Sequence, residues 1–400
     1  MQSAHGSQVV TPAEKFRLQP LFPSGTVIEF PASEPRTWRV LYVLLRTCYK
    51  PLMDLCPAGA AIDWNRNLSK ITREDADVFS LVYSELFEQK LAEKPNKSLA
   101  AAMPDWHLPR CTLKVAMEIS TIAAQTSIQS PQQLNRHYKS FSSETYGETN
   151  LEQMASILDE LRLGPEDVFV DLGSGIGQLV CFAATYANVK KCVGVEIAAL
   201  PAQLASSYSD CFKQFTAHFG KECSEFELHQ GDFLAPQFKK LICEEATVIF
   251  INNFAFDPQL MHRIVFELLQ ELNHGVRIVT SKPFTSPKAE LNSRGMTDFS
   301  AMSDSTTLKS IDNNVSWTSN TITFTLTTVN HEKLFTHFEQ NGAGRRAGAR
   351  SSRRQATAES AAPAEQEGAT NRQERATTSR SGLKKVSKSV IKKPVKSNKK

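Results

Sequence analysis

Apolar residues recur at helical spacing in the first third of the chain. This pattern predicts helices over residues 38–49, 75–91 and 111–124. Pro51 is expected to end the first helix, because a proline interrupts the hydrogen bonds of a helix interior. In the second helix, Val78, Phe79, Val82 and Leu86 are expected to share one buried side.

Farther along, short apolar runs alternate with helical patterns. Strands are expected at 168–172, 191–196, 225–229, 247–251 and 276–280, and helices at 151–161, 178–184, 200–219 and 258–272. Two late β-rich segments, 315–318 and 322–329, follow without intervening helices. The pattern therefore predicts an α/β fold whose sheet is mostly parallel with an antiparallel edge.

These patterns divide the chain into four parts. We expect a flexible N-terminus at 1–20, a mostly helical lobe at 21–135, a catalytic α/β domain at 136–340 and a disordered basic tail at 341–400.

A buried strand at 168–172 runs directly into a glycine-rich turn. Gly173, Gly175 and Gly177 follow Asp171 at every second position, and an apolar helical run begins at Gln178. Glycines allow a tight turn and close approach of a ligand, while a helix N-terminus offers unpaired N–H groups. The stretch predicts a nucleotide-type cofactor site, although its spacing differs from the G-x-G-x-x-G of dinucleotide sites.

Acidic residues follow three successive predicted strands. Asp171 precedes the glycine turn, Glu196 ends the next strand, and Asp232 with Phe233 follows the third. A carboxylate in the position of Glu196 is placed to accept ribose hydroxyls, and Asp232 and Phe233 offer an acceptor and a ring to adenine. The alternative is that each acid caps a helix or turn.

The predicted strand ends offer amides and aromatic rings, without a nucleophile beside a base, a metal cluster or a P-loop lysine. The residues considered for an acceptor pocket are Asn252, Phe254, Phe284, Trp317 and Phe324. This set suits methyl transfer from S-adenosylmethionine to a nitrogen, which requires alignment and no covalent intermediate. A lysine acceptor must arrive neutral, and lowering its pKa from ~10.4 to ~7 costs about 4.6 kcal/mol, within reach of burial. Alternatively, Phe324 only packs the late strands.

A polar and aromatic loop at 136–149 precedes the cofactor strand by one helix. Its end, Tyr146-Gly147-Glu148-Thr149, combines a ring, a permissive glycine and two hydrogen-bonding groups. The loop is expected to fold over the glycine turn as a lid; an ordinary packed connection is the alternative.

The composition fits a globular chain with a distinct tail. Apolar residues make up 41% of the chain, no apolar run approaches the ~20 residues of a membrane span, and no signal peptide is evident. The eight cysteines form no C-x-x-C pair, which favours buried free thiols over disulfides or a metal site. No membrane partner and a monomeric chain are expected.

Positive charge is concentrated at the C-terminus. Residues 341–400 contain 16 Lys and Arg against 4 Asp and Glu, a net +12; the 46 basic and 42 acidic residues of the whole chain leave 30 against 38, a net −8, for residues 1–340. The tail cations expected to bind DNA phosphates are Arg345, Arg346, Arg353, Arg354, Lys384, Lys385, Lys392, Lys393, Lys399 and Lys400. A nuclear import signal or mere solubility are alternative roles.

Several long motifs resemble the disruptor-of-telomeric-silencing (Dot) family of histone-lysine methyltransferases, which lack a SET domain. The resemblance covers about residues 20–340 and rests on the segments 146–149, 171–178, 231–234, 248–256, 277–284 and 315–318. It implies a class I, Rossmann-like S-adenosylmethionine-dependent methyltransferase with a seven-stranded sheet. It also implies a nuclear enzyme that methylates a lysine in the globular core of histone H3 in nucleosomes and acts in silencing.

The resemblance also assigns roles to individual residues. The implied cofactor-binding residues are Tyr146, Gly147, Glu148, Thr149, Phe169, Asp171, Gly173, Ser174, Gly175, Gly177, Gln178, Glu196, Asp232 and Phe233. Asn252, Phe324 and Tyr146 are the expected catalytic residues, with Asn252 at the lysine channel, and Phe254, Phe284, Trp317 and Arg294 are expected to contact the substrate or nucleosome. Two residues depart from the family pattern: Phe324 replaces a tyrosine and Glu290 replaces a basic residue.

Two other functions remain open at this point. A chromatin-binding protein that kept the fold but lost catalysis is one, and the acids and Asn252 argue against it. An NAD-dependent oxidoreductase is the other, but it requires G-x-G-x-x-G and a hydride-transfer residue, and neither is present.

Overall fold

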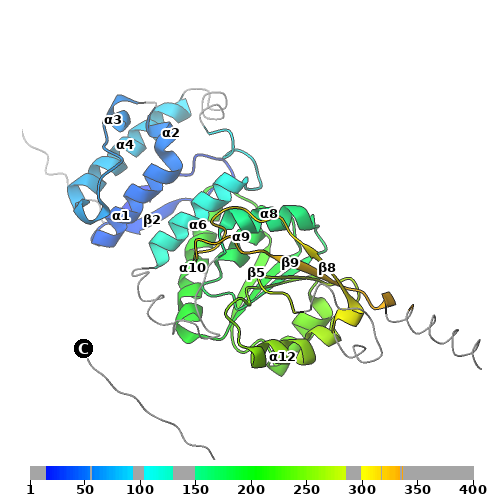
Figure 1. Ribbon diagram of the computed structural model, residues 1–400. Helices are drawn as coiled ribbons and strands as arrows, with labels where there is room; N and C mark the ends of the chain where they lie inside the picture. Colours follow the sequence, from blue (N-terminus) through cyan, green and yellow to red (C-terminus); the bar gives the residue numbers. More distant parts are fainter. Residues whose placement is uncertain are drawn as a thin grey trace, which may run out of the picture. The chain divides into compact units, whose positions relative to one another are not determined.

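The computed structural model describes residues 15–54, 56–92, 103–128, 149–284, 299–316, 318–333 and 336 (Figure 1). The chain divides into two units, Met1–Asn341 and Gly342–Lys400. Every labelled helix and strand belongs to the first unit, and the second lies outside the described residues.

A seven-stranded sheet forms the centre of the described part of the chain. Its strands are β3 (Val168–Leu172), β4 (Lys191–Glu196), β5 (Glu225–Gln230), β6 (Val248–Ile251), β7 (Arg277–Thr280), β8 (Ser303–Thr307) and β9 (Thr325–Val329). They lie in the order β5-β4-β3-β6-β7-β9-β8, in which the first five are parallel and β9 and β8 are each antiparallel to their neighbour. This confirms the predicted mostly parallel sheet with an antiparallel edge, and with it the class I methyltransferase fold.

The strand order reverses beside β3. The chain proceeds outward from β3 to β4 and β5, then returns to place β6 on the other side of β3. In open α/β sheets, ligands bind at the carboxyl ends of the strands where the order reverses. The glycine turn follows β3 and therefore lies at this point.

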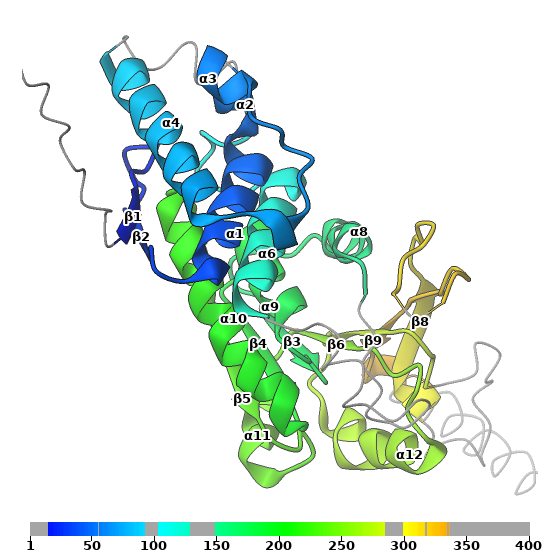
Figure 2. The same ribbon diagram turned by 90° about the vertical axis from the view of Figure 1, so that its left-hand side faces the viewer.

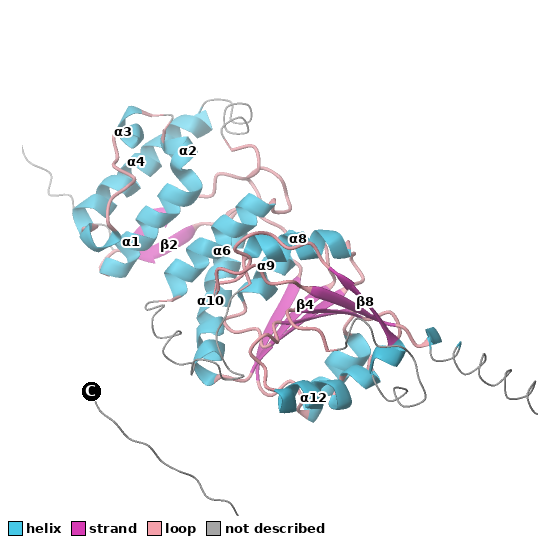
Figure 3. Cartoon of the chain, in the orientation of Figure 1, coloured by secondary structure: helices cyan, strands magenta, loops and turns pink. Residues whose placement is uncertain are grey.

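Helices cover both faces of the sheet (Figure 3). One face carries α6 (Leu113–Ser127), α8 (Leu151–Leu161), α9 (Gln178–Tyr186) and α10 (Ala199–His218); the other carries α11 (Pro236–Lys240), the π-helical η3 (Leu241–Glu245), α12 (Pro258–Glu267) and η4 (Leu269–Glu271). Because side chains alternate along a strand, Phe169 and Phe250 face the first group, and Val170 and Ile249 the second. No described helix is long and apolar enough to cross a membrane.

The N-terminal part is mostly helical, as predicted, but begins with a hairpin. Its elements are β1 (Lys15–Leu18), β2 (Ile28–Pro31), α1 (Pro35–Leu44), the π-helical η1 (Leu45–Tyr49), α2 (Lys50–Met53), α3 (Pro57–Ala60), η2 (Leu68–Lys70) and α4 (Arg73–Ala92). The flexible N-terminus expected at 1–20 is wrong for residues 15–18, because β1 pairs with β2 and buries Phe16 and Leu18. Residues 1–14 lie outside the described part.

Two local expectations for this region are also corrected. Pro51 does not end the helix: the chain passes through the π-turn η1, and Pro51 lies in the first turn of α2, where its missing N–H is not needed. Val78 is 51% exposed, so it does not share the buried side of α4 with Phe79, Val82 and Leu86.

The N-terminal helices are joined to α10 by a buried polar contact. The Tyr49 hydroxyl hydrogen-bonds with His218 Nε2, and His218 Nδ1 lies 2.7 Å from the Thr26 carbonyl oxygen. A carbonyl only accepts, so Nδ1 carries the proton. Burial lowers the pKa of His218 to about 4, which keeps the ring neutral at physiological pH. The lobe and the sheet accordingly form one unit.

The late strands differ in part from the prediction. Strand β9 falls within the expected segment 322–329, but Val315 makes only an isolated bridge to Thr149, and β8 was not predicted. Strand β8 has the sequence Ser-Asp-Ser-Thr-Thr and only Ser303 is buried. An edge strand with one exposed face does not need the apolar pattern that sequence analysis detects.

The expectation of buried free thiols holds for only part of the set of cysteines. All eight cysteines are unpaired, and five of them are buried.

An ion pair joins the chain segments at the amino ends of the central strands. Arg277 of β7 donates from Nη2 to Asp167 Oδ1 at 2.6 Å and from Nη1 to the Leu161 carbonyl at 2.8 Å. Asp167 also accepts from Thr247 Oγ1 at 2.7 Å and from the Gly164 amide at 2.8 Å. Burial acts to raise the pKa of Asp167, but these hydrogen bonds and Arg277 hold it below its ordinary value.

We expect Arg277→Met to lower the free energy of unfolding by about 2 kcal/mol, because the Asp167 carboxylate and the Leu161 carbonyl lose a charged donor. Chemical denaturation at pH 7 measures the change. The control is Arg263→Met, which removes an exposed pair with Glu267 and should cost less than about 0.5 kcal/mol. Since the pKa of Asp167 is depressed, its stabilisation is present at neutral pH and is lost as the pH falls below about 4. Equal losses of unfolding free energy in the two variants at pH 7 would contradict the stabilising role of the Arg277–Asp167 ion pair.

Candidate functional site

The three glycines of the turn adopt a left-handed backbone. Their φ angles are 88° at Gly173, 56° at Gly175 and 77° at Gly177, a region that costs other residues roughly 1–2 kcal/mol. The amides of Gly173 and Ser174 donate to the Val195 carbonyl at 2.8 and 3.1 Å. The turn is therefore bonded to the neighbouring strand β4.

Gly173 and Gly177 have different surroundings. A Cβ added at Gly177 would overlap the Leu228 side chain, whereas one at Gly173 would have Phe256 Cζ as its nearest atom, at 4.0 Å. Gly177 is thus required by packing within the protein. Among the described residues, only Phe256 comes within 4.0 Å of a Cβ at Gly173, which leaves the backbone of Gly173 accessible to a ligand.

Two acidic side chains are buried next to the turn. Asp171 is 2% exposed and Glu196 is 7% exposed. Burial, and then the charge of Glu196, raise the pKa of Asp171 to about 8. Glu196 Oε2 accepts the Gly175 amide at 2.8 Å and Oε1 accepts the Ala198 amide at 2.7 Å. A carboxylate has about four acceptor sites, so its chemistry suits a ligand's hydroxyl groups.

The third acid also caps a local turn. Asp232 Oδ1 accepts the Leu234 amide at 2.9 Å, and the Gly231 amide donates to the Glu196 carbonyl at 2.8 Å. Because β3, β4 and β5 are adjacent, the three acids stand at three neighbouring strand ends, as predicted. Phe233 is 8% exposed and packs against the α11 side of the core.

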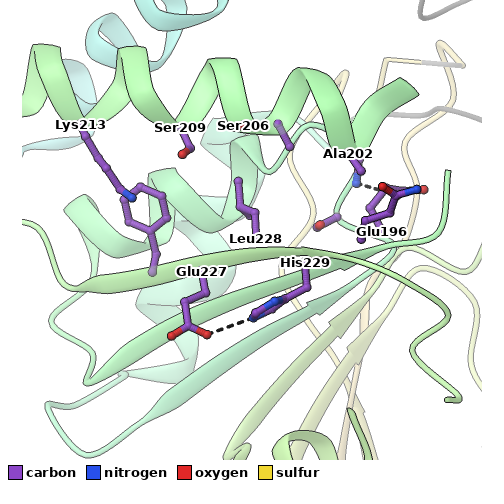
Figure 4. A pocket seen from close by; sticks show the side chains of 13 residues that line it. Glu196, Ala202, Ser206, Ser209, Lys213, Glu227, Leu228 and His229 are labelled. Atoms are coloured by element: carbon purple, nitrogen blue, oxygen red, sulfur yellow. Dashed lines mark hydrogen bonds and ion pairs between the residues drawn. The ribbon is translucent and has the colours of Figure 1, made fainter. Parts of the chain in front are cut away.

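A pocket of about 300 Å³ extends from the glycine turn between α10 and β5 (Figure 4). Ser174, Gly175 and Glu196 line its end at the turn. Along the rest, small residues of α10 face β5: Ala202, Ala205, Ser206 and Ser209. Lys213 lies at the other end with its ammonium 4.7 Å from the Phe226 ring centre. The pocket is thus continuous with the two features predicted to hold a cofactor.

Gln178, the first residue of α9, is connected to the N-terminal helices. Its Nε2 donates to Ser120 Oγ of α6 at 3.5 Å, and Ser120 Oγ lies 2.7 Å from the Tyr208 hydroxyl of α10. Ser120 and Tyr208 have no exposed surface. Sequence analysis missed both, because a hydroxyl within an apolar helix carries no motif.

The strand ends on the other side of β3 carry two asparagines with different roles. Asn252 Oδ1 accepts from Ser281 Oγ at 2.8 Å and its side chain is partly exposed. Asn253 is fully buried; its amide donates to the Lys282 carbonyl at 2.7 Å and accepts the Lys282 N–H at 2.9 Å. Asn253 therefore joins β6 to β7, and Asn252 is the asparagine that is partly exposed at the surface. Phe254 is 47% exposed and Phe284 is half-buried.

Two predicted site residues have buried side chains. Phe169 has no exposed surface and packs in the core four residues before Gly173, so its side chain faces the core. Phe324 is also fully buried and stacks on Phe250, with ring centres 6.0 Å apart. This favours the packing role that the sequence left open for Phe324.

One side chain beside the site was overlooked. Ile197 directly follows Glu196 and is 51% exposed, which is unusual for a large apolar residue at a strand end. Its position makes it a candidate to contact an apolar or aromatic part of a ligand. The sequence signal that could have identified Ile197 is an apolar residue directly after the acid that ends the second strand.

Other predicted residues lie outside the described part of the chain. These are Tyr146, Gly147, Glu148, Glu290, Arg294, Trp317 and all the tail cations. Thr149 is described; it is 3% exposed and makes a bridge to Val315. Among the described residues, no group of three or more His, Cys, Asp or Glu side chains is arranged to hold a metal ion.

The sequence matches known proteins over much of this region. A histone-lysine N-methyltransferase from Caenorhabditis elegans, named as specific for H3 lysine-79, is 44% identical over 84% of this chain and 35% of its own length. The Drosophila melanogaster protein of the same name is 32% identical over 56% of this chain and 12% of its own length. The chain therefore spans about a third or less of these relatives.

A solved structure and a family model also match. The structure of an RNA methyltransferase from Salinibacter ruber in complex with S-adenosyl-L-homocysteine matches 46% of this chain and 94% of its own, at 18% identity and a TM-score of 0.30. The family described as histone methylation protein DOT1 matches residues 124–329, which include the glycine turn, the three acids and Asn252. The chain belongs to the DOT1 family.

Proposed function

We propose that the chain is an S-adenosylmethionine-dependent histone-lysine N-methyltransferase that acts on a lysine in the globular core of histone H3 within nucleosomes. The observation that carries the proposal is the glycine turn bonded to Glu196, with Asp171 beside it, in a chain of the DOT1 family. The relatives named as specific for H3 lysine-79 support the substrate. A nuclear location follows from that substrate.

The residues around the turn fit S-adenosylmethionine. Gly173 leaves room for a ligand against its backbone, and the pocket beside it is lined by Ser174, Gly175 and Glu196. Glu196 would accept the ribose hydroxyls, and Asp171 would attract the positively charged amino acid end. Asp232 and Ile197 stand where adenine would be held. When bound, the cofactor supplies an electrophilic methyl group.

The residues across β3 would receive the lysine. Asn252, oriented by Ser281, presents its side-chain amide at the adjacent strand end, and exposed Phe254 offers an apolar surface. Burial against such a surface favours the neutral amine that attacks the methyl group, and Asn252 can hydrogen-bond to it. The proton leaves the amine for solvent, so no dedicated base is required.

The direct test is incubation with labelled S-adenosylmethionine and either nucleosomes or free histones. We expect label on histone H3, greater with nucleosomes, and none with Gly173→Arg, because the arginine side chain would fill the space beside the turn. The variant should stay folded, since Phe256 Cζ, at 4.0 Å, is the one described atom near a Cβ at Gly173 and the left-handed φ of 88° costs a side chain only roughly 1–2 kcal/mol. Nucleosome binding without transfer by the wild type would favour a chromatin-binding protein that has lost catalysis.

Cofactor affinity should depend on pH through Asp171. Its pKa is raised to about 8, so the carboxyl is mostly protonated below that pH and must ionise to attract a cation. We expect affinity to rise by up to about tenfold per pH unit between pH 6 and 8 and to level off above 8. Calorimetry should find Asp171→Asn weaker and nearly flat over that range. A wild-type profile parallel to that of the variant would rule out this role.

We also propose that the basic tail binds DNA. If about 6 of its cations meet phosphates, the logarithm of affinity should fall against the logarithm of salt concentration with a slope near −5. Deleting residues 341–400 should flatten that slope and lower nucleosome methylation, with cofactor affinity unchanged. Titrations with labelled DNA at several salt concentrations measure the slope. A truncated chain with the full-length slope would show that residues 1–340 hold the DNA.

A further inference from the structure

The connection between β8 and β9 runs beside α8 (Figure 2). Within it, Ser316, Ser319 and Asn320 are exposed, whereas Val315 and Ile322 on either side are buried. We call the exposed residues of this connection (Ser316, Ser319 and Asn320) its tip, and the buried residues on either side (Val315 and Ile322) its base. Apart from the bridge of Val315 to Thr149, its described residues belong to no strand, so other groups must hold the base in place.

The side chain of Gln153 forms one half of that support. Gln153 lies on α8 and has no exposed surface. Its Nε2 donates to the Lys309 carbonyl at 2.9 Å, and its Oε1 accepts the Ile311 amide at 2.9 Å. The amide thus pairs with main chain at two points, as a neighbouring strand would. Its orientation is fixed, because each end meets a partner of one type only.

Asn314 forms the other half. It is fully buried; Nδ2 donates to the Ile322 carbonyl at 2.6 Å, and Oδ1 accepts the Ile322 amide at 3.0 Å. Nδ2 also lies 3.1 Å from Gln153 Oε1, which links the two amides. Asn314 therefore closes the base of the tip across residues 314–322, and Gln153 holds that closed base on α8.

This base lies between two parts of the candidate site. The Asn314 carbonyl accepts the Asn150 amide at 2.9 Å, next to the Thr149–Val315 bridge. On the other side, Ile322 is two residues from Phe324, whose ring stacks on Phe250 of β6. Phe250 lies two residues before Asn252. The base of the tip is accordingly fixed between Thr149 and the buried ring of Phe250, two residues before Asn252.

We infer that Gln153 and Asn314 are positioning residues for the histone substrate: their paired amides hold the exposed tip beside the acceptor end of the site. The inference rests on the proposed function. Neither residue touches the turn or Glu196 through its side chain. The contact of Asn314 with the start of α8 is made by its main chain and does not require the asparagine side chain.

The test compares Gln153→Met and Asn314→Ser with Arg277→Met, whose site is at the opposite ends of the strands. Methionine preserves the volume of Gln153 while removing its hydrogen bonds, and Asn314→Ser is a milder second variant. We expect kcat on nucleosomes to fall about tenfold or more in the first two variants, since a displaced contact surface misaligns the substrate. Cofactor affinity by calorimetry should stay within about twofold of wild type. Arg277→Met should lose comparable thermal stability and keep its kcat.

Hydrogen exchange gives an independent readout that does not depend on activity. The amides of Ile311 and Ile322 should exchange faster in Gln153→Met and Asn314→Ser than in Arg277→Met. Faster exchange with unchanged kcat would show a purely structural role and overturn the inference, as would unchanged exchange. A wild-type chain that methylates no histone overturns the proposed function, and the positioning role with it. An active wild type with fully active variants overturns the positioning role alone.

Discussion

The hydrogen bond from the Gly175 amide to the Glu196 carboxylate is the contact on which the site depends. A turn of three left-handed glycines has few side chains with which to pack, so main-chain hydrogen bonds and the adjacent strand must define its shape. Glu196 accepts such a bond at the end of β4, and the Val195 carbonyl accepts two more, from the amides of Gly173 and Ser174. Glu196 lies close enough to Asp171 for its charge to help hold the proton of that acid. One carboxylate therefore shapes the turn and adds to burial in raising the pKa of the acid beside it.

Side-chain amides also hold main chain in place, at positions beyond the ends of the strands. Asn253 bonds to both main-chain groups of Lys282 just beyond β6 and β7, and Asn314 bonds to both main-chain groups of Ile322 between β8 and β9. An amide carries one donor and one acceptor group, as a peptide unit does. These residues extend main-chain pairing past the strand ends without requiring extended backbone. Irregular segments near the site are thereby held by hydrogen bonds of the kind that pair strands.

The sequence was sufficient for the parts of the fold that depend on local pattern. Helix α8 has the predicted bounds, and the acids 171, 196 and 232 stand at adjacent strand ends because alternation of strands and helices implies parallel order. It failed where burial depends on distant residues. Phe169 and Phe324 resembled site residues by position, yet both are core side chains. The contacts of Gln153 with Lys309, and of Ser120 with Gln178, join residues far apart in the chain and leave no local signal.

The distribution of cysteines has a practical consequence. Burial raises the thiol pKa of Cys48 in the N-terminal helices and of Cys181 and Cys192 beside the sheet well above the usual value, so these groups are both inaccessible and un-ionised in the folded chain. Cys223 is exposed as a residue, and partial desolvation of its thiol raises the pKa to about 11. Alkylating reagents will therefore modify the thiols of Cys48, Cys181 and Cys192 slowly in the native chain. The rate at which each buried thiol is labelled then measures how often its own region opens.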